Sequence, residues 1–282
     1  MQESADRPLN IVVLVKHVPD TQFDRHLTGP GHTLDRSESI LSELDEYALE
    51  AALQLAEARG GQKAGNRVTA LTMGPDAAVN AVKKALQIGA YQGVHLNDAA
   101  LAGSDAAATS LALAAAIGHI GSADGTPGLP DLVLTGMSST DGETSLVPAQ
   151  LAERLGLAQV TFAAELEITD VDGAPTVTAR RDGDSYSETV HAALPALVSV
   201  TDQANDPRYP NFKGIMTAKK KPITVLTLAD IGVDPALVGS AGSWTSVAAS
   251  APRPPRAAGT IITDDGDAGV KLVDYLAAHK LI

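Results

Sequence analysis

The stretch "DLVLTGMSSTDGETSLVPAQLAERLG" (Asp131–Gly156) carries the pattern that decides the fold. It opens on a short apolar run, continues through a loop rich in glycine and hydroxyl groups, and ends in a helical pattern closed by glycine. A short apolar run bounded by turn residues is typical of a buried strand. The order strand, loop, helix therefore predicts one β–α unit of a layered α/β fold.

Three comparable units precede this stretch. Strands are predicted over 10–18, 67–75 and 93–98, and helices over 42–61, 76–90 and 104–121. Ser42, with Asp45 three residues later, is the predicted N-cap of the first helix, and Ser104 that of the third. Four β–α units in a row predict a parallel sheet with right-handed crossovers and helices on both faces.

The pattern changes after this unit. Residues 162–194 alternate polar and apolar side chains around turn signals at Asp172–Gly173 and Asp182–Gly183, which predicts antiparallel strands added to the sheet. Apolar runs at 195–202 and 223–228 predict two further buried strands. Residues 121–130 are predicted to form a loop.

A C-terminal arm is predicted beyond the α/β domain of residues 1–228. Residues 229–282 lose core character in a small, polar, proline-bearing stretch that is too long for an ordinary loop, and then end in an amphipathic helix. Such an arm can dock on another subunit or pack back on its own domain, and the pattern leaves both open.

Composition excludes several classes of function. The net charge of −13 disfavours nucleic acid as a partner, because phosphate would be repelled. The absence of cysteine excludes disulfides, thiolate metal sites and cysteine nucleophiles, so redox chemistry requires a bound cofactor. The seven histidines show no metal-ligand spacing, no catalytic motif occurs, and we expect no metal and no catalytic residue. Without a basic leader or a long apolar run, we expect a cytoplasmic protein with no membrane insertion.

The loop Thr135–Ser145 is the strongest candidate for a small-molecule site. It leaves the carboxyl end of a strand and enters a helix N-terminus, where free N–H groups suit a phosphate. The alternative is an ordinary loop in which Thr144 or Ser145 caps the helix. No Walker loop and no G-x-G-x-x-G opens a helix here. Two other strand ends, at Lys16–Asp20 and Thr72–Asp76, are expected on the same edge of the sheet.

The segment "NDPRYPNFKGIMTAKKKP" (Asn205–Pro222) is unusual for an acidic chain, because its local charge is +4. Apolar residues surrounded by lysines are typical of a docking surface, whereas burial of the same residues would make them core.

The ordered set of motifs resembles the β subunit of electron transfer flavoprotein. The motifs are "VVLVKHVPD", "LDEYALEAALQL", "ALTMGP", "KALQIGA", "DLVLTGMSSTDGETSLVPAQLAERLG", "RRDGDSYSETVHAALPALVSVTDQANDPRY" and "IMTAKKKPITVLTLADIGV". Each motif alone is weak evidence for the resemblance. The ordered set is specific, and it spans essentially the whole chain.

This resemblance implies a Rossmann-like fold of the adenine-nucleotide α-hydrolase type and a heterodimer with a homologous α subunit. FAD would be held mainly by the α subunit, and AMP would be bound structurally in this chain. The heterodimer would carry electrons from acyl-CoA and related dehydrogenases to a membrane quinone oxidoreductase.

The resemblance also implies which residues bind the nucleotide. Carried over by position, they are Leu14, Ser42, Glu43, Leu44, Asp45, Met73, Gly136, Met137, Ser138, Ser139, Thr140, Asp141, Gly142, Glu143, Thr144 and Ser145. At Leu44 and Thr21 the chain departs from many relatives, which carry aromatic residues near the flavin there.

Two alternatives remain beside AMP binding. The loop "STDGETSLVP" is closer to that of flavin-bifurcating relatives, whose β subunit binds a second FAD. The other alternative is a protein that is not an electron carrier, either a free-standing nucleotide-binding regulator or an adenylate-forming enzyme of the same fold. The missing pyrophosphatase loop S-G-G-x-D-S counts against the enzyme.

The segment Asn205–Pro222, named the docking segment below, matches the loop through which relatives contact dehydrogenases. The resemblance implies that Phe212 is the apolar anchor and that nearby cations steer the approach. The implied docking residues are Arg208, Tyr209, Phe212, Lys213, Ile215, Met216, Lys219, Lys220 and Lys221.

Overall fold

The computed structural model describes residues 7–29, 32–122, 128–251 and 253–282. The chain divides into two units, Met1–Ala248 and Ala249–Ile282. Part of the loop predicted at 121–130, and the first six residues, lie outside the described ranges.

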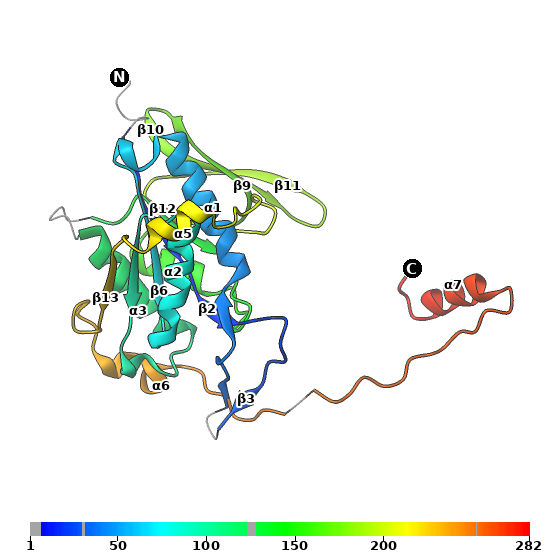
Figure 1. Ribbon diagram of the computed structural model, residues 1–282. Helices are drawn as coiled ribbons and strands as arrows, with labels where there is room; N and C mark the ends of the chain where they lie inside the picture. Colours follow the sequence, from blue (N-terminus) through cyan, green and yellow to red (C-terminus); the bar gives the residue numbers. More distant parts are fainter. Residues whose placement is uncertain (1–6, 30–31, 123–127, 252) are drawn as a thin grey trace. The chain divides into compact units, whose positions relative to one another are not determined.

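One mixed sheet forms the centre of the first unit, as predicted (Figure 1). Among the described residues it has nine strands in the order β11-β10-β9-β12-β8-β1-β6-β7-β13. Their bounds are β1 Asn10–Leu14, β6 Arg67–Met73, β7 Gln92–Leu96, β8 Leu132–Gly136, β9 Ala158–Val171, β10 Ala174–Asp182, β11 Ser187–Ala193, β12 Ala196–Val200 and β13 Ile223–Leu226.

Parallel pairing runs from β9 through β12, β8, β1, β6 and β7 to β13. The carboxyl ends of β1, β6 and β8 therefore meet at one edge of the sheet. The register places Val13 opposite Ala70 on one side and Leu134 on the other.

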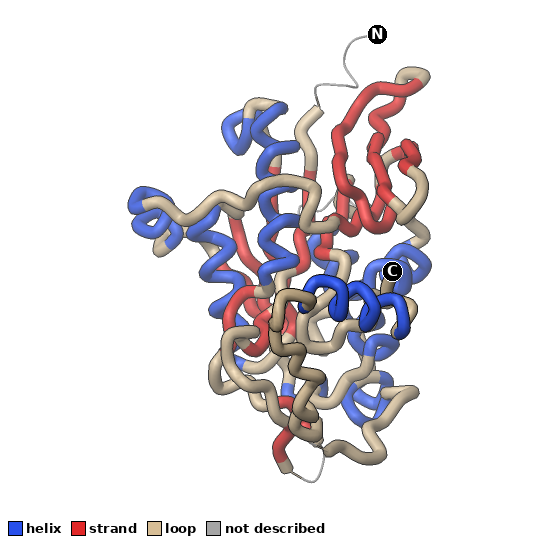
Figure 2. The backbone as a smooth tube through the Cα atoms, turned by 90° about the vertical axis from the view of Figure 1, so that its right-hand side faces the viewer, coloured by secondary structure: helices blue, strands red, loops and turns tan. Residues whose placement is uncertain are grey.

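Helices cover both faces of the sheet (Figure 2). Their buried side chains form two cores with those of the strands. One face packs against α1 (Glu43–Ala58) and α2 (Val79–Ile88), and the other against α3 (Ala106–Ser122) and α4 (Val147–Leu155). Neighbouring strand residues alternate between them, so that Val13 lies in the first core and Val12 in the second. The fully buried side chains of both cores are aliphatic.

The antiparallel addition is also confirmed. β9 and β10 form a hairpin whose turn, Asp172–Gly173, has both φ angles positive. That conformation favours Asp-Gly and matches the twist of the strands. β11 then pairs with β10 and makes the outer edge of the sheet.

The strand predicted over 10–18 is shorter than expected. β1 ends at Leu14, and β2 (His17–Pro19) pairs instead with β5 (Ser39–Leu41), while β3 (Leu27–Thr28) pairs with β4 (Thr33–Leu34). The cause is at Lys16, whose N–H donates to Asp45 Oδ2 and whose carbonyl accepts from the N–H of Ser42. The start of α1 thus takes the backbone groups that would have continued the sheet.

Of the two predicted helix caps, Ser42 is confirmed in position and Ser104 is wrong by one residue. Ser42 stands at the N-cap of α1, but its hydroxyl makes no capping bond, and Asp45 bonds to Lys16 instead. For α3 the cap is Asp105 rather than Ser104, because Asp105 Oδ1 accepts the N–H of Ala108 at 3.0 Å. The Ser104 hydroxyl donates to the carbonyl of Leu101.

The first unit extends about twenty residues past 228, the predicted end of the domain. Val238, between η4 (Pro235–Leu237) and α6 (Gly239–Gly242), is buried in the second core. The second unit consists of an extended stretch and α7 (Ala268–Ala278), in which no residue is buried. No helix in the described ranges is long and apolar enough to cross a bilayer.

Candidate functional site

Three charged side chains meet where β1 and β8 end. Lys16 Nζ donates to Asp141 Oδ1 at 2.8 Å, and Arg36 Nη2 donates to Asp141 Oδ2 at 2.5 Å. The Asp141 side chain is 2% exposed, and its Oδ1 also accepts the N–H of Gly142. Burial alone would raise the pKa of Asp141, but the Lys16 charge and the bonds from Lys16 and Arg36 hold it well below the ordinary value. The cluster has one carboxylate and two cations, so it keeps a positive charge.

Arg36 lies in the segment between β2 and β5, which pair with each other, and its side chain reaches this edge. Its Nη1 donates to the carbonyl of His17, and Arg25 from the same segment donates to the carbonyl of Thr140. Sequence reasoning missed both arginines. Their one signal is that they are the only Lys or Arg between Lys16 and Arg59 in an acidic stretch.

A second buried carboxyl, that of Asp45, joins α1 to the end of β8. A Cβ added at Gly136 would lie 2.8 Å from Asp45 Oδ1 and from the carbonyl oxygen of Leu44, so the close approach requires glycine. Burial raises the pKa of Asp45 to about 7, although the N–H groups of Lys16 and Gly136 and the charge of Lys16 oppose that shift.

Several buried hydroxyl groups at this edge have no hydrogen-bond partner. Ten buried side-chain nitrogen or oxygen atoms among the described residues have no hydrogen-bond partner. Five of them are hydroxyl oxygens at this edge, those of Ser42, Thr72, Thr135, Ser138 and Thr140. Buried polar groups are normally satisfied, and an unsatisfied one costs about 1–3 kcal/mol. Hydroxyl groups beside a positive cluster can together hold an anionic, hydroxylated ligand.

The remaining predicted residues surround this edge. Leu14, Leu44, Met73, Met137 and Ser139 are half-buried, whereas Glu43 and the loop from Gly142 to Ser145 are exposed. Neither Thr144 nor Ser145 caps α4, whose N-cap is Leu146 without a side-chain bond. The loop is therefore not the simple capped connection considered as its alternative.

The docking segment contains a short helix, α5 (Phe212–Ala218), that sequence analysis read as loop. Its predicted apolar residues are on the surface, with Tyr209 89% and Phe212 81% exposed and Ile215 and Met216 also exposed. Lys213, Lys219 and Lys220 are exposed as well. Arg208 and Lys221 differ from these lysines because both side chains have partners within the first unit.

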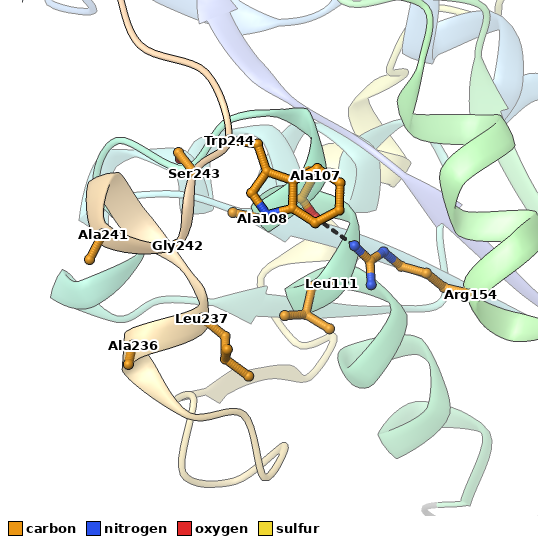
Figure 3. Close-up of a pocket in the computed structure, with 10 residues that line it drawn as sticks. All are labelled: Ala107, Ala108, Leu111, Arg154, Ala236, Leu237, Ala241, Gly242, Ser243 and Trp244. Carbon is orange, nitrogen blue, oxygen red and sulfur yellow. Dashed lines mark hydrogen bonds between the residues drawn. The ribbon is translucent and has the colours of Figure 1, made fainter.

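A separate hollow of about 370 Å³ lies at the start of α3 (Figure 3). Trp244 lies over the helix there, and Arg154 Nη2 donates to the carbonyl of Ala107. None of its lining residues was predicted as a site residue. Within the described ranges, no group of three or more acidic or histidine side chains is placed to hold a metal ion.

Comparison with known proteins identifies the family. The family model described as the electron transfer flavoprotein domain matches residues 32–231. Over 275 residues the chain is 47% identical to electron transfer flavoprotein subunit beta of Mycobacterium leprae. The aligned region covers 97% of this chain and 99% of that protein. The chain belongs to the electron transfer flavoprotein β-subunit family.

Two other proteins are similar to this chain over most of their length. The electron transfer flavoprotein subunit beta of Megasphaera elsdenii is 34% identical over 280 residues, covering 97% of this chain and all of that protein. The caffeyl-CoA reductase-Etf complex subunit CarD of Acetobacterium woodii is 35% identical over 256 residues, covering 90% and 92%. Membership of an electron transfer flavoprotein family implies a flavin, and a β subunit implies an α subunit beside it.

Proposed function

We propose that this chain is the β subunit of a heterodimer that carries electrons from acyl-CoA and related dehydrogenases to a membrane quinone oxidoreductase. FAD, held mainly by the α subunit, supplies the redox chemistry when bound. This chain contributes a structural AMP site, the docking segment and the C-terminal arm.

The positive cluster with its unpartnered hydroxyls is the observation that carries the AMP assignment. Lys16 and Arg36 share one carboxylate, that of Asp141, so this cluster keeps a positive charge, which suits a phosphate. Ser138 and Thr140 lie in the loop beside it and offer hydroxyl groups without partners. Leu14 and Met73, at the ends of β1 and β6, offer apolar contacts for adenine. The residues present therefore fit a nucleoside monophosphate.

The arm is proposed to bind the α subunit. Val270, Leu272, Val273, Leu281 and Ile282 are each at least half exposed in α7 and just beyond it. Exposed apolar side chains in such number mark an interaction surface, and the family supplies the partner.

The docking segment is proposed to meet the dehydrogenases. Phe212 would insert into an apolar pocket of the partner, while Lys213, Lys219 and Lys220 would speed the encounter. The same surface is proposed to bind the quinone oxidoreductase. The carrier would then dissociate from its donor before it binds its acceptor.

A second FAD in place of AMP is the alternative supported by a specific observation. CarD is named as a subunit of a caffeyl-CoA reductase-Etf complex, and the loop of this chain reads "STDGETSLVP". Family membership favours either electron carrier over the free-standing regulator.

Nucleotide analysis of the purified heterodimer tests the assignment. The protein is denatured, and the released nucleotides are separated and quantified by chromatography. We expect one FAD and one AMP per heterodimer, and Arg36→Gln should lower the AMP content while leaving FAD unchanged. Two FAD and no AMP would replace this assignment with the bifurcating one.

A further inference from the structure

The docking segment is held to the first unit close to both of its ends. Each attachment uses one of the cations that sequence analysis assigned to steering, Arg208 before α5 and Lys221 after it. The contacts of these two residues differ in kind from those of the other cations.

Arg208 makes the first attachment, with two glutamates of α1. Its Nε donates to Glu50 Oε2 at 2.7 Å and its Nη2 to Glu50 Oε1 at 2.9 Å. On the other side, Nη1 and Nη2 donate to the two carboxylate oxygens of Glu57 at 2.6 and 2.9 Å. Only the planar fork of arginine can serve two carboxylates in this way.

The Glu50 side of this attachment is buried, whereas the Glu57 side chain is half exposed. The Glu50 side chain is 5% exposed, and the backbone N–H of Arg208 also donates to it at 3.3 Å. Burial would raise the pKa of Glu50, yet the bonds from Arg208 lower it. Beside it, Asn205 Nδ2 donates to the carbonyl of Tyr47 at 3.0 Å. With two carboxylates beside it, the charge of Arg208 is compensated within the protein.

Lys221 makes the second attachment, with the C-terminus of α2. Its Nζ donates to the carbonyls of Ala90 at 2.6 Å, Leu86 at 2.9 Å and Gly89 at 3.4 Å. These carbonyls carry the partial negative charge of a helix end, which a cation stabilises. Gly214 of α5 also lies so close to α2 that an added Cβ would be 2.5 Å from the Gln87 carbonyl oxygen.

Between the attachments, α5 is short but locally defined. Asn211 caps it by accepting the N–H of Gly214 at 2.8 Å. A helix of seven residues has little stability of its own, so its order must come from the contacts around it. The side chains of Tyr209, Phe212 and Met216 nevertheless stay exposed.

We propose that Arg208 and Lys221 are positioning residues that hold α5 in its docking conformation before the dehydrogenase arrives, and that they do not steer the encounter. The proposal rests on the proposed docking function. A preformed anchor lowers the entropic cost of binding, whereas steering depends on cations whose charge is not compensated. Lys213, Lys219 and Lys220 fill that second role.

The experiment compares Arg208→Gln with Lys220→Gln in the full heterodimer. Hydrogen exchange of residues 209–218 reports the order of α5, and stopped-flow reduction of the flavin by an acyl-CoA dehydrogenase gives the encounter rate at several ionic strengths. Arg208→Gln should speed exchange about tenfold and raise several-fold the heterodimer concentration that gives half-maximal flavin reduction, with the limiting rate and the salt dependence unchanged. Lys220→Gln should weaken the salt dependence and leave exchange unchanged.

Two further variants keep the test decisive. Glu57→Gln leaves the Glu50 pair intact and should show the exchange effect at smaller size if Arg208→Gln fails to fold. Phe212→Ala should slow electron transfer without changing the hydrogen exchange of α5. Wild-type electron-transfer rates in Phe212→Ala would show that the docking function proposed for this segment is wrong. Unchanged exchange in Arg208→Gln, or a loss of salt dependence equal to that of Lys220→Gln, would overturn the positioning role.

Discussion

At the scale of single residues, the carboxyl edge of the sheet combines groups that sequence reasoning could and could not find. Lys16 and Asp141 were predicted there because each follows a buried strand. Arg36 was not, because it reaches Asp141 only through the β2–β5 pairing, which no periodicity indicates. The strand ends are a local property of the sequence, whereas the placement of the segment that supplies the second cation is not.

Asp45 makes stability depend on pH in an unusual direction. Its pKa is raised to about 7, above its ordinary value near 4, so the folded state binds a proton that the unfolded state releases. This group therefore favours folding at low pH, and that contribution is lost as the pH rises to 7. Between pH 5.5 and 8 the loss amounts to about 2 kcal/mol.

Asp45→Asn should remove this contribution. Urea unfolding at pH 5.5 and pH 8 should show a change in the free energy of unfolding that is smaller in the variant than in the wild type by about 2 kcal/mol. The control is Glu43→Gln, an exposed neighbour in the same turn. Equal pH dependence in wild type and Asp45→Asn would show that Asp45 titrates normally.

At the scale of elements, the cap of α3 also holds the segment that follows β13. Asp105 Oδ1 accepts the N–H of Ala108, while Oδ2 accepts the N–H groups of Trp244 and Thr245 and the Thr245 hydroxyl. One carboxylate thus joins two elements that are distant in sequence. Burial would raise its pKa, but these bonds together lower it below the ordinary value.

Asp105→Ala should therefore cost more than a lost cap. We expect about 2 kcal/mol of the free energy of unfolding, against about 1 kcal/mol for a typical N-cap. Urea unfolding measures it, and Ser122→Ala, at the exposed end of the same helix, serves as control. A loss of only about 1 kcal/mol would show that the bonds to Trp244 and Thr245 contribute nothing beyond the cap.

The helices that the sequence predicted show a periodic pattern and the strands an apolar or alternating run, whereas the elements that it missed show neither. α5 lies inside a charged segment, and its cap, Asn211, was not distinguished from a turn residue. The cap of α3 was assigned one residue too early because serine and aspartate are adjacent there, and only the structure shows which side chain meets the free N–H.

At the scale of the whole molecule, the division into two units places residues 229–248 with the α/β core. Composition suggested the opposite, because this stretch is small and polar, yet Val238 is buried and Asp105 binds the end of the stretch. Local composition cannot show contacts with a helix more than a hundred residues away.

Removal of residues 249–282 should separate folding from assembly. The truncated chain should keep a cooperative thermal transition, because both cores lie in the first unit. It should fail to co-purify with the α subunit, since the arm supplies the proposed contact. Co-purification at wild-type yield would show that the arm is dispensable for the heterodimer.

At this scale, an acidic chain is proposed to dock its redox partners through one short cationic segment with Phe212 as its anchor. The most direct measurement is stopped-flow reduction of the heterodimer's flavin by an acyl-CoA dehydrogenase, with wild type and Phe212→Ala compared at equal flavin content. Truncation of a docking anchor typically costs about 2 kcal/mol or more, so the second-order rate constant should fall about 30-fold or more while thermal stability is unchanged. A wild-type rate constant in Phe212→Ala would show that Phe212 is not the docking anchor.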